Sequence, residues 1–205
     1  MKKMNFPNSK PKILITLILS FHFFTISTSQ QIQQPTTPNL QNALLDDAID
    51  DAINKPQKNY KALLEQQEFL SAHNKARLHI GEPVFIWDTS LALFATQFTR
   101  QRATDCALIH SNGPYGENIF WGSGNQWTPT DVVRLWIKEH KFYDRTSNSC
   151  ANGKICGHYT QIVWRDSVRL GCARVQCNSG DVFVICTYDP PGNYVDEQPL
   201  VDHRS

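Results

Sequence analysis

The stretch RLGCARVQCNSGDVFVICTYD, residues 169–189, decides the fold of this chain. Two runs rich in strand-forming residues flank the turn NSGD, in which Gly180 permits a tight reversal. Cys172 and Cys186 lie at equal distances, seven residues, from Ser179 in this turn. The pattern predicts an antiparallel β-hairpin in which the two cysteines face each other at a distance that suits a disulfide.

Three segments ahead of the hairpin have the apolar spacing of helices. The first, residues 63–80, has a core-facing stripe and ends at Gly81 and Pro83. The second starts after Asp88, a good N-cap, and the third starts at Thr128 with a proline in its first turn. The predicted stripes comprise Phe69, Ala72, His73, Ala76 and Ile80; Leu91, Ala95, Phe98 and Arg102; and Val132, Val133, Trp136 and Ile137.

The segment YGENIFW, residues 115–121, alternates like a strand between the second and third helices. Its period of two places Tyr115, Glu117, Ile119 and Trp121 on one side. Helices and an antiparallel sheet in mixed order predict an α+β domain or a layered α–β–α domain.

The first 29 residues have the composition of a secretory signal peptide. A front with four lysines precedes the apolar run ILITLILSFHFF, residues 13–24, and small residues follow as far as Ser29. This run is shorter than the roughly 20 residues that span a bilayer, which argues against a membrane anchor. We therefore expect cleavage near Ser29 and an extracellular protein.

Residues 30–60 are rich in Gln, Pro and Asp, and we expect a linker or propeptide there. The run ALLDDAIDDAI, residues 43–53, has helical spacing, but Pro56 should end that helix. A short helix with nothing to pack against is marginal in water. The main domain is expected over residues 61–199, with a short tail at residues 200–205.

The charge balance excludes one class of partner. All four charges before residue 30 are lysines, so the rest of the chain keeps 16 of the 20 basic side chains against 19 acidic ones. A formal charge near −3 gives no support for binding to nucleic acid, which needs a basic surface.

Six cysteines behind a signal peptide predict three disulfides rather than a metal cluster. Cys172 and Cys186 oppose each other in the hairpin. Cys150 and Cys156 close a small loop that contains an Asn-Gly turn, and Cys106 then remains for Cys177. Each bond should contribute about 2–4 kcal/mol to stability.

Two histidines and two glutamates are the candidates for chemistry. Glu117 shares a strand face with apolar residues, and Glu139 follows Trp136 on the apolar face of its helix. The Asn-Gly-Pro turn after His110 can bring that histidine back beside Glu117, and the Cys150–Cys156 loop fixes the backbone of His158. A buried carboxylate needs a partner. Four such groups in one cleft could bind a divalent metal such as Zn²⁺ or act as general acids and bases. The alternative is a satisfied hydrogen-bond network of two His–Glu pairs.

Several motifs together resemble the plant pathogenesis-related class 1 proteins. They are HSNGPYGENIFWGSG, GHYTQIVW, RLGCARVQC and YDPPGNYVDEQP, within residues 60–199. These proteins belong to the superfamily of cysteine-rich secretory proteins, antigen 5 and pathogenesis-related proteins. The resemblance implies a three-layer α–β–α sandwich with a central antiparallel sheet and a cleft lined by His110, Glu117, Glu139 and His158. The disulfide pattern of the family agrees with the three pairs above.

The resemblance also implies a function. We expect a secreted, monomeric plant defence protein without enzymatic activity, located in the apoplast or cell wall, or alternatively in the vacuole. Its implied partners are a sterol or lipid and the surface or membrane of a pathogen, with no required cofactor.

Two other functions stay open. One is a metal-dependent hydrolase that uses the cleft, for which Ser111 beside His110 invites a protease interpretation; the chain has no Gly-x-Ser-x-Gly or His-Glu-x-x-His motif. The other is the precursor of a signalling peptide released between Asp189 and Pro190. Thr187 stands where the family often has Asn, and the chain ends QPLVDHRS instead of the family's RPY, which argues against release.

Overall fold

The computed structural model describes residues 40–200, and for residues 40–48, 50 and 51 it describes only the backbone. The chain divides into two units after Leu44, and the unit that starts at Leu45 contains the sheet and the helices that cover it. The expected signal peptide, the start of the expected linker and residues 201–205 of the expected tail lie outside the described residues.

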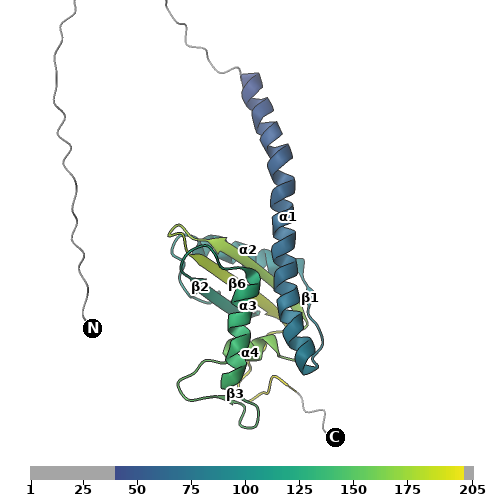
Figure 1. The fold of residues 1–205 in the computed structure, drawn as a ribbon, viewed down its shortest axis with the longest axis vertical. Coiled ribbons are helices and arrows are strands. Elements are labelled where there is room, and N and C mark those ends of the chain that lie inside the picture. The colour runs from purple at the N-terminus through teal and green to yellow at the C-terminus, as the bar shows by residue number, and fades with distance from the viewer. Residues whose placement is uncertain (1–39, 201–205) are drawn as a thin grey trace, which may run out of the picture. The chain divides into compact units, whose positions relative to one another are not determined.

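Helix α1, Leu40–Ile80, is longer than the sequence predicts (Figure 1). It runs through Pro56, so the predicted stop at this proline is wrong, and the expected linker is helical from Leu40 onward. A proline inside a helix removes one N–H donor but leaves the hydrogen bonds of the neighbouring turns in place. Every side chain from residue 52 to residue 64 is exposed, so this part of α1 is solvated.

The second half of α1 packs into the core as predicted. Phe69 and Ala72 are buried, and His73 is fully buried beside them. The helix ends at Ile80, where Gly81 takes a φ of +81°, a left-handed conformation that costs glycine little.

The central sheet has the strand order β1-β5-β6-β2. Strands β5 (Arg169–Gln176) and β6 (Val182–Asp189) form the predicted hairpin, in which Cys172 is opposite Cys186. Strand β2 (Gly116–Gly122) pairs antiparallel with β6. Strand β1 (Ile86–Trp87) pairs parallel with β5, so it adds a short parallel edge to the predicted antiparallel pairs and the sheet is mixed. The two-residue β1 has no sequence signal of its own and depends on tertiary contacts.

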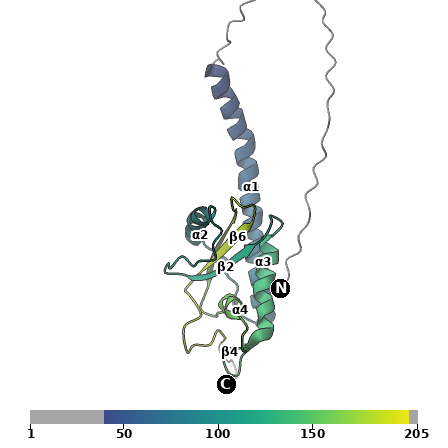
Figure 2. The same cartoon turned by 90° about the vertical axis from the view of Figure 1, so that its left-hand side faces the viewer.

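Helices cover both faces of this sheet, as Figure 2 shows. Successive side chains of β6 point to opposite faces of the sheet, so they pack in two different cores. Val182, Val184, Cys186 and Tyr188 pack in the core with α1, α3 (Pro129–Ile137) and α4 (Gly157–Ile162). Phe183 and Ile185 pack in the other core with α2 (Thr89–Arg102). The predicted α–β–α layering is therefore confirmed.

Both predicted helix starts are confirmed by their caps. Asp88 accepts hydrogen bonds from the backbone N–H groups of Ser90 and Leu91 at the start of α2 (Thr89–Arg102). Thr128 and Asp131 form a capping box at the start of α3 (Pro129–Ile137). A 3₁₀ helix, η1 (Lys138–Phe142), continues directly from α3.

Short elements connect α3 to the hairpin. Strands β3 (Tyr143–Asp144) and β4 (Ser149–Cys150) form a two-stranded sheet, and α4 (Gly157–Ile162) follows. Buried Arg77 on α1 holds the end of α4, because its guanidinium donates to the carbonyls of Ile162 at 3.0 Å and Trp164 at 2.7 Å. Burial lowers the pKa of Arg77 to about 10, so it stays charged at neutral pH.

Three disulfides join the pairs expected from the sequence. They are Cys106–Cys177, Cys150–Cys156 and Cys172–Cys186. The third lies in the hairpin with its Cα atoms 4.1 Å apart, and the first ties the segment after α2 to the end of β5.

Gly171 on β5 gives the first testable prediction. A Cβ atom there would overlap the backbone of Leu91 and Ala92, which cannot move without displacing α2. We expect Gly171→Ala to lower the free energy of unfolding by about 1–3 kcal/mol, measured by chemical denaturation. Gly157→Ala is the control, because its Cβ would meet its nearest neighbour at 3.9 Å. Equal stability of the two variants would contradict this packing.

Candidate functional site

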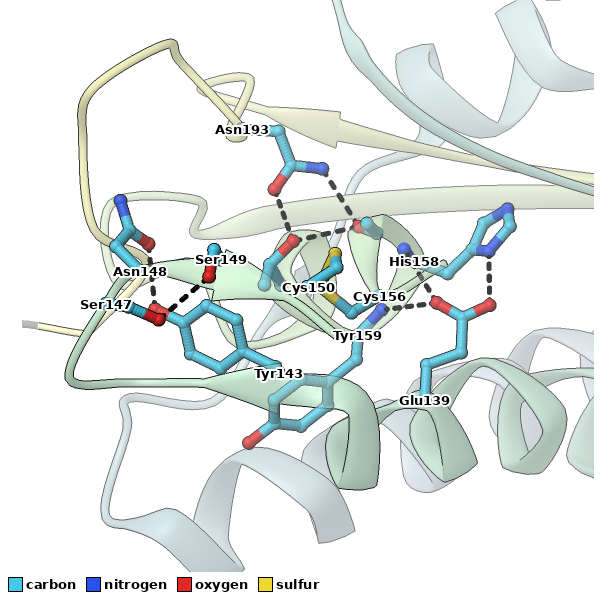
Figure 3. Close-up of a disulfide and its surroundings, with 12 residues drawn as sticks. Glu139, Tyr143, Ser147, Asn148, Ser149, Cys150, Cys156, His158, Tyr159 and Asn193 are labelled. Atoms are coloured by element: carbon cyan, nitrogen blue, oxygen red, sulfur yellow. Dashed lines mark hydrogen bonds and ion pairs between the residues drawn. A yellow bond between two sulfur atoms is a disulfide. The ribbon is translucent and has the colours of Figure 1, made fainter. Parts of the chain in front are cut away.

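Glu139 joins η1 to the first turn of α4. No side chain caps α4 in the usual way at Cys156. Instead, Glu139 Oε2 accepts the backbone N–H of His158 at 3.0 Å and that of Tyr159 at 3.4 Å. Its Oε1 lies 2.7 Å from Nδ1 of His158 (Figure 3). One carboxylate therefore caps the helix and orients the imidazole.

The location of Glu139 refines the prediction. Its side chain is 16% exposed, but it lies on the 3₁₀ turn after α3 rather than on the α-helical face predicted with Trp136. Trp136 stacks on the ring of His158, with centroids 5.8 Å apart and an interplanar angle of 16°. The imidazole of His158 is thus held on its face by an indole and at one edge by a carboxylate.

His110 and Glu117 form the second pair. The loop after α2 returns to β2, and Nδ1 of His110 lies 3.0 Å from Glu117 Oε2. The backbone N–H of Ser111 donates to the same oxygen at 3.0 Å, and the Ser111 hydroxyl donates to Oε1. Glu117 is 5% exposed, whereas His110 is 56% exposed. The Ser111 hydroxyl is therefore bound to a carboxylate and not to a histidine that could activate it.

The second pair shifts the pKa of both partners. The hydrogen bond that His110 donates to Glu117 raises the pKa of His110 above its ordinary value, although burial opposes this shift. Burial alone would raise the pKa of Glu117, but the hydrogen bonds from His110 and Ser111 outweigh it and lower that pKa. The pair is therefore ionised over a wider pH range than two isolated groups.

Both glutamates contact Nδ1 of their histidine. An ionised carboxylate only accepts hydrogen bonds, so Nδ1 carries the proton and Nε2 keeps its lone pair in the neutral ring. Histidines that bind metals are oriented in this way by a carboxylate. Each pair thus offers one nitrogen ligand, while its carboxylate oxygens already accept hydrogen bonds from N–H groups and, in Glu117, from the Ser111 hydroxyl.

The four predicted site residues lie as two pairs. In the part of the chain that the structure describes, no group of three or more His, Cys, Asp or Glu side chains is arranged to hold a metal ion. A cavity of about 270 Å³ lies beside His110 and is lined by Glu117, Gln161 and Asn193 among others, but not by His158. A catalytic zinc site needs about three protein ligands, and this arrangement does not provide them.

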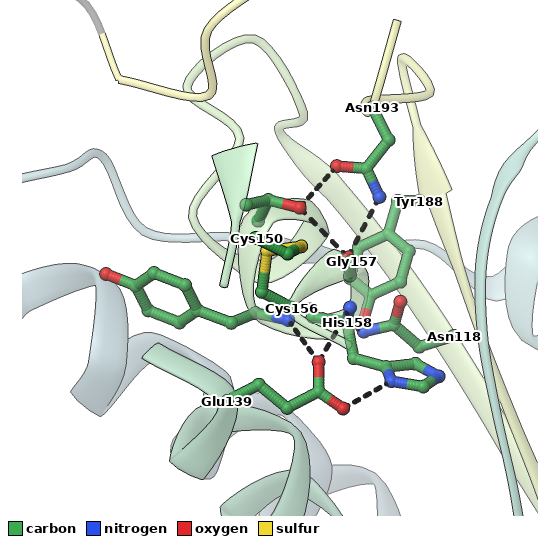
Figure 4. A network of polar contacts seen from close by, with 10 residues as sticks. Asn118, Glu139, Cys150, Cys156, Gly157, His158, Tyr188 and Asn193 are labelled. Carbon is green, nitrogen blue, oxygen red and sulfur yellow. Dashed lines mark hydrogen bonds and ion pairs between the residues drawn. A yellow bond between two sulfur atoms is a disulfide. The ribbon is translucent and has the colours of Figure 1, made fainter. Parts of the chain in front are cut away.

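A chain of hydrogen bonds connects His158 to the core, and Figure 4 shows two of its members, Asn118 and Tyr188. Nδ1 of His73 donates to the carbonyl of Phe69 at 2.8 Å, because a carbonyl only accepts. Nε2 of His73 must then accept the proton of the Tyr188 hydroxyl at 2.8 Å. The amide of Asn118 donates to that hydroxyl at 3.1 Å and to the carbonyl of His158 at 3.0 Å. The chain therefore reaches from the core helix α1 to the backbone of the site.

His73 is neutral in this network. Complete burial lowers its pKa to about 4, while the hydrogen bond to Phe69 opposes the shift. Burial likewise raises the pKa of Tyr188, so its hydroxyl keeps its proton. These states match the directions of donation derived above.

Sequence reasoning missed Asn118, Tyr188 and Asn193. Asn118 lies two residues before Phe120 in β2, so both side chains lie on the same face of the strand, and Phe120 packs in the main core. A polar residue on a core-facing side of a strand is a signal that could have identified Asn118. Tyr188 looks like an ordinary strand residue. Asn193 lies in a loop, and no periodicity applies there.

The residues of the expected peptide-release site lie at the end of β6. Asp189 pairs with Arg169, and its carbonyl accepts the N–H of Val168 at 3.1 Å. Ser167 donates to the carbonyl of Pro190 at 2.7 Å. Both sides of the Asp189–Pro190 bond are thus hydrogen-bonded to the segment before β5.

Comparison with known proteins gives the class of the chain. The family model described as the cysteine-rich secretory protein family, CAP, matches residues 70–188. The solved structure of Na-ASP-1 has the same fold, with a TM-score of 0.56 and 24% identity over 66% of this chain and 41% of that chain. The chain belongs to the cysteine-rich secretory protein family.

Within that family the chain is similar to plant pathogenesis-related class 1 proteins. It is 52% identical to pathogenesis-related protein 1A of Nicotiana tabacum over 139 residues, which cover 68% of this chain and 83% of the relative. It is 54% identical to pathogenesis-related protein 1A1 of Solanum lycopersicum over 136 residues, which cover 66% and 77%. The predicted family resemblance is confirmed.

One further observation concerns membranes. None of the helices in the described part of the chain is long and apolar enough to cross a membrane.

The His110–Glu117 pair gives a pH prediction. Its stabilising effect should fade as the pH falls through the lowered pKa of Glu117 and as it rises through the raised pKa of His110. We expect Glu117→Gln to lower the pKa of His110, because the raising effect of the carboxylate is lost while the opposing effect of burial remains; NMR titration of the ring measures it. Glu139→Gln, in the other pair, should leave that pKa unchanged. An unaltered His110 titration in Glu117→Gln would disprove the pairing.

Proposed function

We propose that this protein is a secreted plant defence protein of the pathogenesis-related class 1 type that acts by binding and not by catalysis. The observation that carries this proposal is the 52% identity to the tobacco protein over 83% of that relative's length. The three disulfides suit an extracellular location, where they persist. We place the protein in the apoplast or cell wall, with the vacuole as the alternative.

A groove between α1 and α3 supports a sterol or lipid as the ligand. It encloses about 540 Å³, within the range of about 300–1,000 Å³ that ligand pockets occupy. Leu64, Ala72, Ala76 and Ile137 supply apolar surface. Lys75 and other charged residues of the two helices also line it, so a ligand with an apolar body and one polar end would fit.

The aromatic segment at residues 119–127 is a weaker candidate for the ligand wall. Ile119 is buried in the core on the α2 side, and Phe120 packs edge-on against Trp127 with centroids 5.0 Å apart. Trp121 is 43% exposed and is the one large apolar side chain of the strand left open to a ligand. The segment mainly serves core packing.

The arrangement of the His–Glu pairs argues for binding over hydrolysis. Each carboxylate already accepts three hydrogen bonds, and the Ser111 hydroxyl is bound to Glu117 rather than to a histidine. A divalent cation would find one Nε2 atom on each pair, and the remaining ligands would have to be water. We therefore propose that any zinc binding here is weak and that the metal-dependent hydrolase is the less favoured function.

Release of a C-terminal peptide is a second candidate function. Pro190 is exposed, so a protease can approach the Asp189–Pro190 bond. The hydrogen bonds on both sides of this bond have to open before it enters a protease site. Detection of a fragment that begins at Pro190, by mass spectrometry of the extracellular fluid after wounding, would support this function.

The ligand groove gives a direct test. Ala76→Trp places an indole in the groove, so we expect the binding of a labelled sterol or fatty acid to weaken by about tenfold or more, measured by equilibrium binding to the secreted protein. Ala151→Trp, on an exposed loop, is the matched control and should bind like the wild type. Absence of saturable binding by the wild-type protein would refute the lipid proposal, and equal binding by Ala76→Trp would refute its placement in this groove.

Metal binding can be tested separately. We expect titration calorimetry with ZnCl₂ to give a weak signal that the variant His110→Ala/His158→Ala loses, because the two Nε2 atoms are the ligands on offer. Tight binding that survives both substitutions would contradict this assignment.

A further inference from the structure

The first turn of α4 is held by other parts of the chain. The helix is only six residues long, from Gly157 to Ile162. The carbonyl of Gly157 and the N–H of His158 belong to one planar peptide group. Glu139 holds the N–H side of this group at 3.0 Å. The carbonyl side accepts from the Thr160 hydroxyl of α4 at 3.1 Å and from a residue near the end of the domain.

That residue is Asn193, as Figures 3 and 4 show. Its Nδ2 donates to the carbonyl of Gly157 at 2.9 Å, and its Oδ1 accepts from the hydroxyl of Thr160 at 2.7 Å. Its φ of +58° lies in the left-handed region, which Asn tolerates better than most residues. The side chain of Asn193 and that of Glu139 thus clamp the same peptide group from opposite ends.

Asn193 belongs to a segment that is bound along its length, which we call the C-terminal strap (residues 190–199). Gly192 donates to the buried side chain of Gln161 at 3.1 Å. The carbonyl of Glu197 accepts from Asn148 at 2.9 Å, and that of Pro199 accepts from Arg165 N–H at 2.9 Å. The strap therefore follows α4 and the residues after it.

Cavities lie on both sides of Asn193. The one beside His110 encloses about 270 Å³, and a second of about 320 Å³ lies beside the Cys150–Cys156 disulfide. Asn193 lines both of them. The strap thus borders both cavities at Asn193, and the side chain of Asn193 is its main polar contact with α4 at this point.

We propose that Asn193 is a positioning residue for His158, so that the C-terminal strap controls the His158–Glu139 pair. Without Asn193, the Gly157 carbonyl keeps only the Thr160 hydroxyl as a side-chain donor, so the Gly157–His158 peptide group is held less firmly and the contacts of its N–H and of the imidazole with Glu139 weaken. A role of His158 in ligand binding rests on the proposed function. The positioning of His158 by Asn193 does not depend on that function. Cleavage of the strap from β6 would have the same effect on the site.

The experiment replaces the side chain without straining the backbone. Asn193→Gly keeps the left-handed conformation and removes both hydrogen bonds. In ¹⁵N-labelled protein we expect the Nδ1–H resonance of His158 to broaden or vanish. We also expect the His158 amide to exchange with solvent about fivefold faster or more, the factor for one net hydrogen bond. Asn193→Asp keeps the acceptor for Thr160 but loses the donor to Gly157, so it should resemble Asn193→Gly.

Asn148→Gly is the matched control. Asn148 also has a positive φ, of 47°, and also binds the strap, but it does not contact α4. We expect it to leave the His158 resonance and amide exchange unchanged. A wild-type His158 signal in Asn193→Gly would overturn the proposal, and so would an equal loss in Asn148→Gly, which would indicate general loosening. The exchange rates of the amides of β5 and β6 report whether each variant is folded. If Asn193→Gly does not fold, Asn193→Asp serves as the test of the proposal.

Discussion

The hydroxyl of Tyr188 is the interaction on which the rest of the structure depends. It lies on the central strand β6, is fully buried, donates to His73 on α1 and accepts from Asn118 on β2. Asn118 also donates a hydrogen bond to the carbonyl of His158 on α4. A buried polar chain is costly unless every member is paired, and here each member has its partner. One line of hydrogen bonds therefore joins this face of the sheet to α1 and α4, in addition to the bonds from Arg77 to the end of α4.

This constraint explains why the candidate site is rigid on one side and open on the other. His158 is held by Asn118, Glu139, Trp136 and, through Gly157, by Asn193, while His110 stands largely in solvent with only Glu117 to orient it. Catalysis needs polar groups with free capacity close to one reacting atom. In this site the carboxylates of Glu117 and Glu139 are instead engaged by neighbouring donors, which agrees with a role of the two pairs in holding the fold.

Much of this architecture could be predicted from local sequence patterns. Alternation in residues 169–189 predicts the hairpin and its disulfide, and Asp88 and Thr128 mark helix starts, because strand period and caps depend on near neighbours. Pro56 misled the prediction, since one lost hydrogen bond does not end a helix. The parallel pairing of β1 and the clamp by Asn193 join residues 83 and 36 positions apart, and no local pattern encodes such contacts. His73 looked like a core residue, which it is, but its role as an acceptor for Tyr188 appears only in three dimensions.

The central claim is that the buried chain through Tyr188 supports both the core and His158, and Tyr188→Phe tests it most directly. The substitution keeps the ring but leaves Nε2 of His73 without its donor and removes an acceptor of Asn118, so the free energy of unfolding should fall by about 1–3 kcal/mol. The amide of His158 should also exchange faster. Tyr143→Phe, which removes the hydroxyl that donates to Asn148 at a half-buried site, should cost less and leave His158 unchanged. Unchanged stability and unchanged exchange at His158 in Tyr188→Phe would contradict the account.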